Sequence, residues 1–436
     1  MSNANRSLRA LRAVLFSSFV LFAATRVSAQ APAPTPPETP APTPVTASIP
    51  PPPAPPPAAP PTDEDGPVVS AGLGRGVTVR TADGRFSLTT RLRAQIRATY
   101  LSETVGVSEA DQDPAAISAE VRRLRLLFQG NFFGPDWQYY VQLGFSRGDT
   151  ETDLRLPLRD AYVTWSHVRD LNIRFGQGKV PFNRQRVISS SALNMVDRSV
   201  ANAEFNLDRD VGIQLLSTDL GGLDKRLAYN VGIFSGDGRN RIGTNAGLLY
   251  VARFQYAPFG GFDDMVEGDV MRERRLRMAI EVAGAYNMQT LRYRSTWDGT
   301  YLFGPYDYVH ATGDVVLKYA GWSFSAEAIY RGVVGTQSRT QTVDGADVTE
   351  RSRAGWGYNV QTGYFFDEHL EAVARYSHVF PIGDDTGVRE IGELGGGLNW
   401  YFHRHDFKIQ ADYLWLFEDR FDVGRHMARV QAQFYL

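Results

Sequence analysis

The stretch Arg85–Tyr100, RFSLTTRLRAQIRATY, alternates in character with a period of two along its whole length. Its aliphatic and aromatic side chains fall on one face, whereas Arg91, Arg93 and Arg97 fall on the other. Because successive side chains of a strand point to opposite sides, the stretch predicts a ribbon with one apolar and one arginine-rich face. Strands of soluble proteins usually end after about five or six residues. Length and pattern together favour the wall of a barrel that faces lipid outside and water inside.

The composition also favours a β-rich protein. The 436 residues include 25 phenylalanines, 20 tyrosines and 41 glycines, and no cysteine. The lack of cysteine excludes disulfides, thiolate metal ligands and cysteine nucleophiles. No long apolar run follows the N-terminus, which excludes membrane-spanning helices. The net charge of −2 does not identify a partner, because charge can be segregated by face.

The N-terminus has the features of an export signal. Three arginines within the first twelve residues precede the apolar run 13–25, and Val27-Ser28-Ala29 is a small-x-small cleavage motif. Residues 1–29 therefore predict a secretory signal peptide, cleaved after Ala29. The apolar run is too short to cross a hydrocarbon core of about 30 Å, which argues against a membrane anchor.

The segment that follows is rich in proline, alanine and threonine. Residues 30–67 predict a disordered linker, because such a composition cannot bury a core. A cell-wall-binding arm, with peptidoglycan as the partner, is the alternative interpretation. We expect residues 68–84 to lead from the periplasm into an outer-membrane barrel formed by residues 85–436.

The alternating pattern recurs in further runs that are broken by turn residues. These runs cover residues 120–132, 137–145, 156–167, 170–178, 209–217, 226–236, 247–257, 275–289, 311–320, 322–333, 354–366, 369–380, 390–402, 406–418 and 425–436. Together with the first stretch they predict an all-β fold, a transmembrane antiparallel β-barrel of about 16 strands, an even number as in bacterial single-chain barrels. Short and long connections alternate, as expected for periplasmic turns and external loops. The long connection 258–274 falls where a short turn is expected, and the pattern does not explain it.

The polar faces of these strands predict a positively charged lumen. The ten cations that we assign to an anion pathway are Arg91, Arg93, Arg97, Arg123, Arg125, Arg174, Lys179, Arg253, Arg375 and Arg429. Acidic residues on the same faces are fewer, and they include Asp160, Glu281 and Asp412. Rows of arginine and lysine favour anions, because their fixed donors replace part of the hydration shell. Alternatively, the arginines pair with acids on neighbouring strands and brace the wall.

The long connection Val180–Leu207 is a candidate constriction. A structureless loop of this length is uncommon unless it is functional, so we expect it to fold back into the bore. An exposed surface loop is the alternative. The candidate constriction residues are Arg184, Arg186, Ser189, Ser190 and Arg198.

Several segments resemble the family of phosphate-selective porins O and P. They are residues 120–145 (EVRRLRLLFQGNFFGPDWQYYVQLGF), 158–182 (LRDAYVTWSHVRDLNIRFGQGKVPF), 209–214 (RDVGIQ), 251–259 (VARFQYAPF) and 371–377 (EAVARYS). The resemblance implies a sixteen-stranded outer-membrane barrel, usually trimeric, with an arginine ladder, an inward-folded third loop and passage of phosphate or polyphosphate. By motif match it assigns Arg123 and Arg125 to the pore and Gly176–Phe182 to the pore and the start of the constriction loop.

We therefore predict a passive outer-membrane porin that is selective for anions, with phosphate or polyphosphate as the expected substrate. The alternative is a structural outer-membrane tether with a closed barrel and a cell-wall-reaching proline-rich arm. We do not expect an enzyme, because none of the seven histidines lies near a serine-centred motif, and the turn His403–Asp406 holds too few ligands for a metal. The expected partners are outer-membrane lipid, inorganic anions and two further copies in a homotrimer. We expect no catalytic residue, cofactor, metal or nucleic acid.

Overall fold

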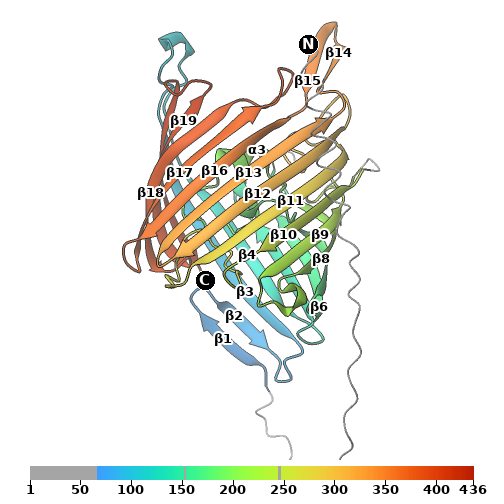
Figure 1. Cartoon of the computed structure of the whole chain (residues 1–436), viewed down its shortest axis with the longest axis vertical. Helices are drawn as coiled ribbons and strands as arrows, with labels where there is room; N and C mark the ends of the chain where they lie inside the picture. Colours follow the sequence, from blue (N-terminus) through green and yellow to red (C-terminus); the bar gives the residue numbers. More distant parts are fainter. Residues whose placement is uncertain (1–65, 152–153, 244–246) are drawn as a thin grey trace, which may run out of the picture. The chain divides into compact units, whose positions relative to one another are not determined.

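The computed structural model describes residues 66–151, 154–243 and 247–436. The predicted signal peptide and nearly all of the predicted linker lie outside these residues. In the described part of the chain, no helix is long and apolar enough to cross a bilayer. The dominant feature is a sheet of eighteen antiparallel strands, sixteen of which close into a barrel (Figure 1).

The barrel strands follow one another around the wall in chain order. They are β3 (Ser87–Leu101), β4 (Ala116–Asn131), β5 (Trp137–Gly144), β6 (Leu158–Val168), β7 (Leu171–Lys179), β8 (Arg209–Ser217), β9 (Leu227–Phe234), β10 (Leu249–Tyr256), β11 (Arg277–Thr290), β12 (Tyr306–Tyr319), β13 (Trp322–Val334), β16 (Gly355–Phe365), β17 (Leu370–Pro381), β18 (Ile391–His403), β19 (Phe407–Glu418) and β20 (Gly424–Tyr435). The last strand, β20, pairs with β3 from Met427↔Leu101 to Tyr435↔Arg93 and closes the barrel. The predicted strand number is confirmed.

Two short hairpins lie outside the barrel wall. β1 (Val68–Gly72) and β2 (Gly76–Arg80) pair with each other, and β2 also pairs with the start of β3. The predicted lead-in 68–84 is thus largely an ordered hairpin at the short-turn end of the barrel. The second hairpin, β14 (Ser338–Val343) and β15 (Ala346–Arg351), stands apart at the long-loop end (Figure 1).

The alternation along β3 separates lipid from lumen as predicted. Leu92, Ile96 and Tyr100 are exposed on the outside, whereas Arg93 is 1% exposed and Gln95 is fully buried in the interior. Apolar side chains on the outer face of a barrel contact lipid and cost no desolvation there. The barrel interior is therefore the polar part of the molecule, and functional groups must be sought there.

Candidate functional site: a cation-lined lumen narrowed by two segments

The connection between β7 and β8 enters the barrel. This third loop, residues 180–208, contains two short helices, α2 (Arg184–Val187) and α3 (Val200–Phe205). The Oγ atom of Ser199 caps α3 by accepting a hydrogen bond of 3.1 Å from the Asn202 backbone N–H. Phe205 is fully buried, and α3 contacts the inner faces of β13, β16 and β17. The third loop therefore lies inside the barrel, against one side of its wall.

Glycines on β16 leave room for this helix. A Cβ atom at Gly355 would lie 2.9 Å from the ring of Phe205, and one at Gly357 would lie 3.2 Å from the Cβ of Ala201. Real Cβ atoms almost never approach other atoms to within 3.0 Å. Larger residues at these luminal positions would therefore push α3 away from the wall.

Cations on the neighbouring strands hold the loop backbone. Lys408 Nζ donates to the carbonyl oxygen of Leu193 at 2.5 Å, and Arg375 Nη1 donates to that of Asp197 at 2.9 Å. Buried donors need acceptors, and loop carbonyls supply them. Lys408 and Arg375 thus position the third loop.

A second segment enters from the opposite end. The inward turn, residues 258–274, connects β10 to β11 on the short-turn side, where the sequence pattern gave no reason for its length. Its Glu267 backbone N–H donates to the carbonyl oxygen of Ala192 in the third loop at 2.9 Å. Met265 and Val266 pack against the buried cluster of Ile188, Ala192 and Leu193 in that loop. The two segments therefore meet inside the barrel and fill the lumen beside β11–β13 and β16.

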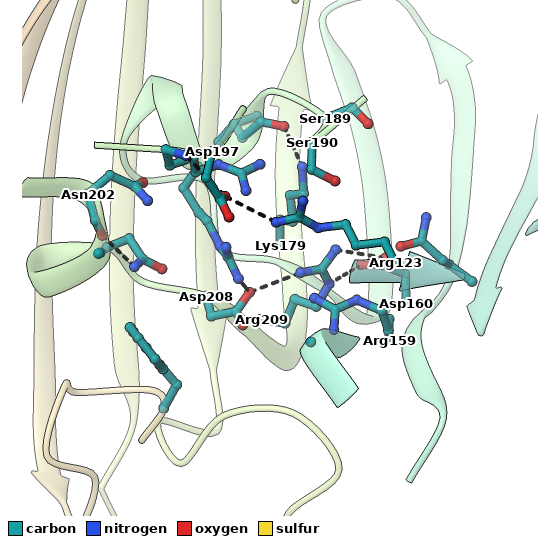
Figure 2. A pocket seen from close by; sticks show the side chains of 18 of the residues that line it. Arg123, Arg159, Asp160, Lys179, Ser189, Ser190, Asp197, Asn202, Asp208 and Arg209 are labelled. Atoms are coloured by element: carbon teal, nitrogen blue, oxygen red, sulfur yellow. Dashed lines mark hydrogen bonds and ion pairs between the residues drawn. The ribbon is translucent and has the colours of Figure 1, made fainter. Parts of the chain in front are cut away.

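A cavity of about 750 Å³ lies between the third loop and the wall (Figure 2). Its strand residues come from β3–β9 and β18–β20, and among the described residues none belongs to β10–β13, β16 or β17. This cavity therefore lies off-centre in the lumen, along β18–β20 and β3–β9.

Positive charge predominates around this cavity. The twelve cationic residues that line it are Arg93, Arg122, Arg123, Arg125, Arg159, Arg174, Lys179, Arg186, Arg198, Arg209, Arg239 and Arg429. The acidic residues that line it are the five carboxylates Glu151, Asp160, Asp197, Asp208 and Glu393. Fixed positive charge in a confined space with low-dielectric walls attracts anions.

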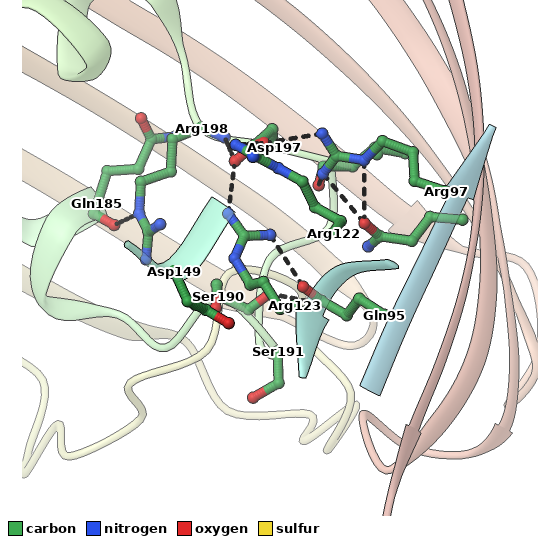
Figure 3. Close-up of polar contacts among 12 residues, drawn as sticks. Gln95, Arg97, Arg122, Arg123, Asp149, Gln185, Ser190, Ser191, Asp197 and Arg198 are labelled. Carbon is green, nitrogen blue, oxygen red and sulfur yellow. Dashed lines mark hydrogen bonds and ion pairs between the residues drawn. The ribbon is translucent and has the colours of Figure 1, made fainter. Parts of the chain in front are cut away.

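Asp197 in the third loop is the acceptor for several of these cations (Figure 3). Its carboxylate lies 3.0 Å from Arg97 Nη1, 3.2 Å from Arg123 Nη2 and 3.4 Å from Arg122 Nη2. Burial disfavours the charged form, but the guanidinium groups outweigh it and hold the pKa of Asp197 well below its usual range. Asp197 is therefore ionised at physiological pH and ties the loop to β3 and β4.

Asp208, at the end of the third loop, is held in the same way. It forms ion pairs with Arg186 and with Arg209, the latter at 3.0 Å. Burial again opposes the charge, yet the nearby arginines keep the pKa of Asp208 well below its usual range. Arg209 also binds Asp160 at 2.9 and 3.2 Å through two nitrogens (Figure 2).

Four of the lining cations have no carboxylate within 4.0 Å in the described part of the chain: Arg93, Arg174, Lys179 and Arg198. Arg93 Nη1 donates to the hydroxyls of Ser189 and Ser191, each at 2.9 Å. Arg174 Nε donates to the hydroxyl of Thr164 at 3.1 Å. Lys179 and Arg198 donate to carbonyl oxygens of the third loop, Lys179 to those of Val187 and Ile188 and Arg198 to those of Gln185 and Ile188. Neutral acceptors leave the positive charge of these side chains uncompensated.

The sequence-based pathway residues divide into two groups. Those that line the cavity are Arg93, Arg123, Arg125, Arg174, Lys179 and Arg429, together with Arg186, Ser189, Ser190 and Arg198 of the third loop. Those that do not line it are Arg91, Arg97, Arg253, Arg375 and Arg184. Arg253 pairs with Glu281, and Arg184 turns to Glu281 and Asp314 instead of the cavity. For Arg253 and for Arg375, which pairs with Glu393, the geometry agrees with the bracing interpretation, and the functional role of both groups stays a prediction.

Sequence reasoning missed Arg122, Arg159, Arg209 and Arg239, and two of these lie at β-bulges. Gln95 pairs with Arg123 and Ile96 with Val121, so Arg122 is an extra residue in β4. In β6 the pairing steps from Asp160 to Leu158 and leaves Arg159 out of register. A bulge breaks strict alternation, so consecutive residues such as Arg122 and Arg123 both reach the lumen. The only signal of these luminal positions in the sequence is that two charged residues are adjacent, as in Arg122-Arg123 and Arg159-Asp160.

In the described residues, no group of three or more histidine, aspartate or glutamate side chains is arranged to hold a metal ion. The turn His403–Asp406 is tied locally instead, with His403 Nδ1 and Asp406 Oδ2 3.1 Å apart.

The closed sixteen-stranded wall, its apolar outside and its narrowed polar lumen define an outer-membrane porin. A sequence profile of the family phosphate-selective porin O and P matches residues 104–436. The chain belongs to this family.

Solved porins share the fold at low sequence identity. The outer membrane channel DcaP of Acinetobacter baumannii is 13% identical, with a TM-score of 0.51 over 80% of this chain and 97% of that chain. The anion-selective porin from Comamonas acidovorans is 11% identical, with a TM-score of 0.51 over 80% and 100%. Salmonella typhi OmpF in complex with daunomycin is 13% identical, with a TM-score of 0.52 over 81% and 98%. No curated protein sequence matches the chain at a significant level.

Proposed function

We propose that this outer-membrane porin is selective for anions and that phosphate is among the anions it passes. The observation that carries the proposal is the charge of the cavity lining, twelve cations against five carboxylates, with four cations that lack a carboxylate partner. The family description, phosphate-selective porin O and P, supports phosphate as the first anion to test.

The route would lead past the stretch 187–191 of the third loop. Arg93, Lys179 and Arg198 converge on this stretch, and their charge attracts an anion toward it. The Ser190 hydroxyl, 3.4 Å from nitrogens of both Arg93 and Arg125, adds a neutral donor at the same place. Such groups replace the water that an anion loses on entering a narrow space.

The carboxylates in the cavity lining allow a bound anion to leave its site. Conduction requires that an anion bind well enough to enter and weakly enough to leave. Asp160, Asp197 and Asp208 neutralise part of the arginine charge, so an anion moves between sites and is not trapped. Transport of this kind is passive and requires neither a cofactor nor catalysis.

The tether alternative requires a closed barrel, and a cavity of about 750 Å³ argues against it. A trimeric assembly and cleavage of residues 1–29 remain predictions, and so does the binding of peptidoglycan by the proline-rich segment, most of which lies outside the described residues.

The test is phosphate block of chloride current through the purified protein in planar bilayers. Wild-type current is expected to fall as phosphate is added. Lys179→Met should weaken the block about tenfold or more, because a hydrogen bond to a charged group contributes about 1.5–3 kcal/mol. Arg169→Gln is the matched control, because Arg169 lies in an exposed turn with its side chain 57% exposed. Block that is absent, or equal in all three proteins, would contradict a phosphate site at this place.

A further inference from the structure

The inward turn, residues 258–274, is the longest of the short-side connections in the described part of the chain. Such connections are usually tight, as at Ala320-Gly321, where both residues adopt positive φ (52° and 94°). The inward turn instead leaves the wall after β10, runs into the barrel and returns to β11. A segment of this length in such a position needs a physical reason.

Charged and polar groups fix the inward turn to the wall. Lys318 of β12 is fully buried, and its Nζ donates to Asp264 Oδ2 at 2.8 Å and to the carbonyl oxygens of Val266 at 2.8 Å and Gly268 at 3.0 Å. Asp269 is also fully buried; it binds Arg277 and accepts a 2.8 Å hydrogen bond from the Gly321 backbone. Lys318 is a buried wall residue that donates to three acceptors of the inward turn, and Asp269 is a buried residue of the inward turn that is bound by the wall. These contacts indicate that the inward turn has one specific binding position on the wall.

Glu267 joins the inward turn to the third loop and to strand β16 of the wall. Its Oε2 accepts from the Asn194 backbone N–H at 2.9 Å and from Gln361 Nε2 of β16 at 3.0 Å, and its Oε1 accepts from Gln185 Nε2 at 3.3 Å. Its own backbone N–H donates to Ala192. One residue thus contacts the third loop at three positions and β16 at a fourth.

The inward turn packs closely against the wall at Gly268. A Cβ atom at Gly268 would lie 2.6 Å from Glu371 Oε1 of β17. Glu371 is fully buried and is held by Tyr401 and Asn399, so it has no room to move aside. The position therefore tolerates only glycine if the inward turn is to reach β17.

We propose that the inward turn is a plug that closes the short-turn end of the lumen along β10–β13, β16 and β17 and supports the third loop from below. The plug confines permeating solutes to the cavity along β3–β9. The short-turn side is the periplasmic side of an outer-membrane barrel, so the plug sets the size of the periplasmic exit. This inference rests on the proposed path of anions through the cavity. It concerns the width of the periplasmic exit, whereas the proposed function concerns the charge selectivity of the channel.

The test replaces residues 260–272 by a short glycine-serine turn and measures single-channel conductance together with the uptake of neutral sugars of increasing size into proteoliposomes. We expect conductance to rise roughly twofold, since it scales with the open cross-section, and larger sugars to enter. The zero-current potential should remain anion-selective, because the cations along β3–β9 are untouched. The matched control removes residues 338–351, the exposed β14–β15 hairpin, and should leave both readouts at wild-type values.

Point substitutions keep the proposal falsifiable if the shortened protein does not fold. Gly268→Leu should raise conductance and sugar uptake in the same direction, because the side chain cannot fit beside Glu371. Glu273→Gln is its control, since the Glu273 side chain is 42% exposed at the edge of the same segment. Wild-type conductance and sugar exclusion in both the shortened protein and Gly268→Leu would overturn the plug. A wild-type protein without anion selectivity would refute the proposed function. The plug would then be tested by sugar uptake alone.

Discussion

Substitution of Asp197 by asparagine is expected to increase anion selectivity. Asp197 is the carboxylate on which Arg97, Arg122 and Arg123 converge, at 3.0 to 3.4 Å. Asparagine keeps the shape of the side chain and one acceptor oxygen, but it replaces the other oxygen by an amide donor and removes the negative charge. The lining then holds twelve cations against four carboxylates, and Arg123 on β4 faces the cavity without an ion-pair partner.

The size of the effect follows from Coulomb's law. An anion held on the far side of Arg123 lies about 6 Å from the Asp197 carboxylate, so at an effective dielectric constant of about 40 the repulsion that is removed is about 1.4 kcal/mol. That free energy corresponds to about a tenfold change in local anion concentration. Counter-ions in the lumen reduce it, and we expect a three- to tenfold rise in the anion-to-cation permeability ratio at about 0.1 M salt. The rise should largely vanish at about 1 M, where the Debye length is about 3 Å.

The assay is the zero-current potential of single bilayers under a salt gradient, measured at both ionic strengths. Asp170→Asn serves as the control, because Asp170 pairs with Arg169 in an exposed turn outside the lumen. A permeability ratio that falls or stays constant in Asp197→Asn would refute the assignment of this region to the ion path.

Three further predictions concern charge and packing around the cavity. Because arginines hold the pKa values of Asp197 and Asp208 well below the usual range, both stay ionised when the pH is lowered from 7 to about 5, and the difference in zero-current potential between wild type and Asp197→Asn should be the same at both pH values. Their contribution to stability should be complete above the unfolded-state pKa of about 3.9 and disappear as the pH falls through the lower folded-state pKa, which acid-induced unfolding followed by circular dichroism would show. Arg209→Gln should lower the free energy of unfolding by about 3–5 kcal/mol, since it leaves Asp160 buried without its cation; an unchanged midpoint in thermal unfolding would count against this. Gly357→Leu should push α3 away from the wall and into the cavity that it lines, and so lower conductance and increase current noise, whereas equal traces for variant and wild type would show that α3 is not seated there.

The wall of the barrel is predictable from the sequence because it obeys one local rule. In β3 the outward Leu92 and Ile96 and the inward Arg93 and Arg97 follow from the period of two alone. The same rule fails where strand pairing is irregular. Arg122 and Arg159 reach the lumen because bulges at Gln95/Ile96 and Gln142/Leu143 shift the register, and nothing in the single strand reveals where its partner will slip.

The filling of the lumen is less predictable because it depends on long-range contacts. The third loop was expected inside the barrel from its length and family resemblance, but the side on which it packs depends on partners more than a hundred residues away, such as Gly355 for Phe205 and Lys408 for Leu193. Arg253 and Arg375 share the strand pattern of Arg93. They are separated from the cavity only because the third loop and the inward turn occupy their half of the lumen.

The central claim is that the charge of the lumen selects anions, and the most direct test is the zero-current potential of the wild-type protein in a planar bilayer between two concentrations of potassium chloride. The account predicts a potential with the sign of chloride permeation, reduced stepwise as Arg93, Lys179 and Arg198 are replaced by neutral residues. A potential with the sign of potassium permeation, or one that does not respond to these replacements, would contradict it.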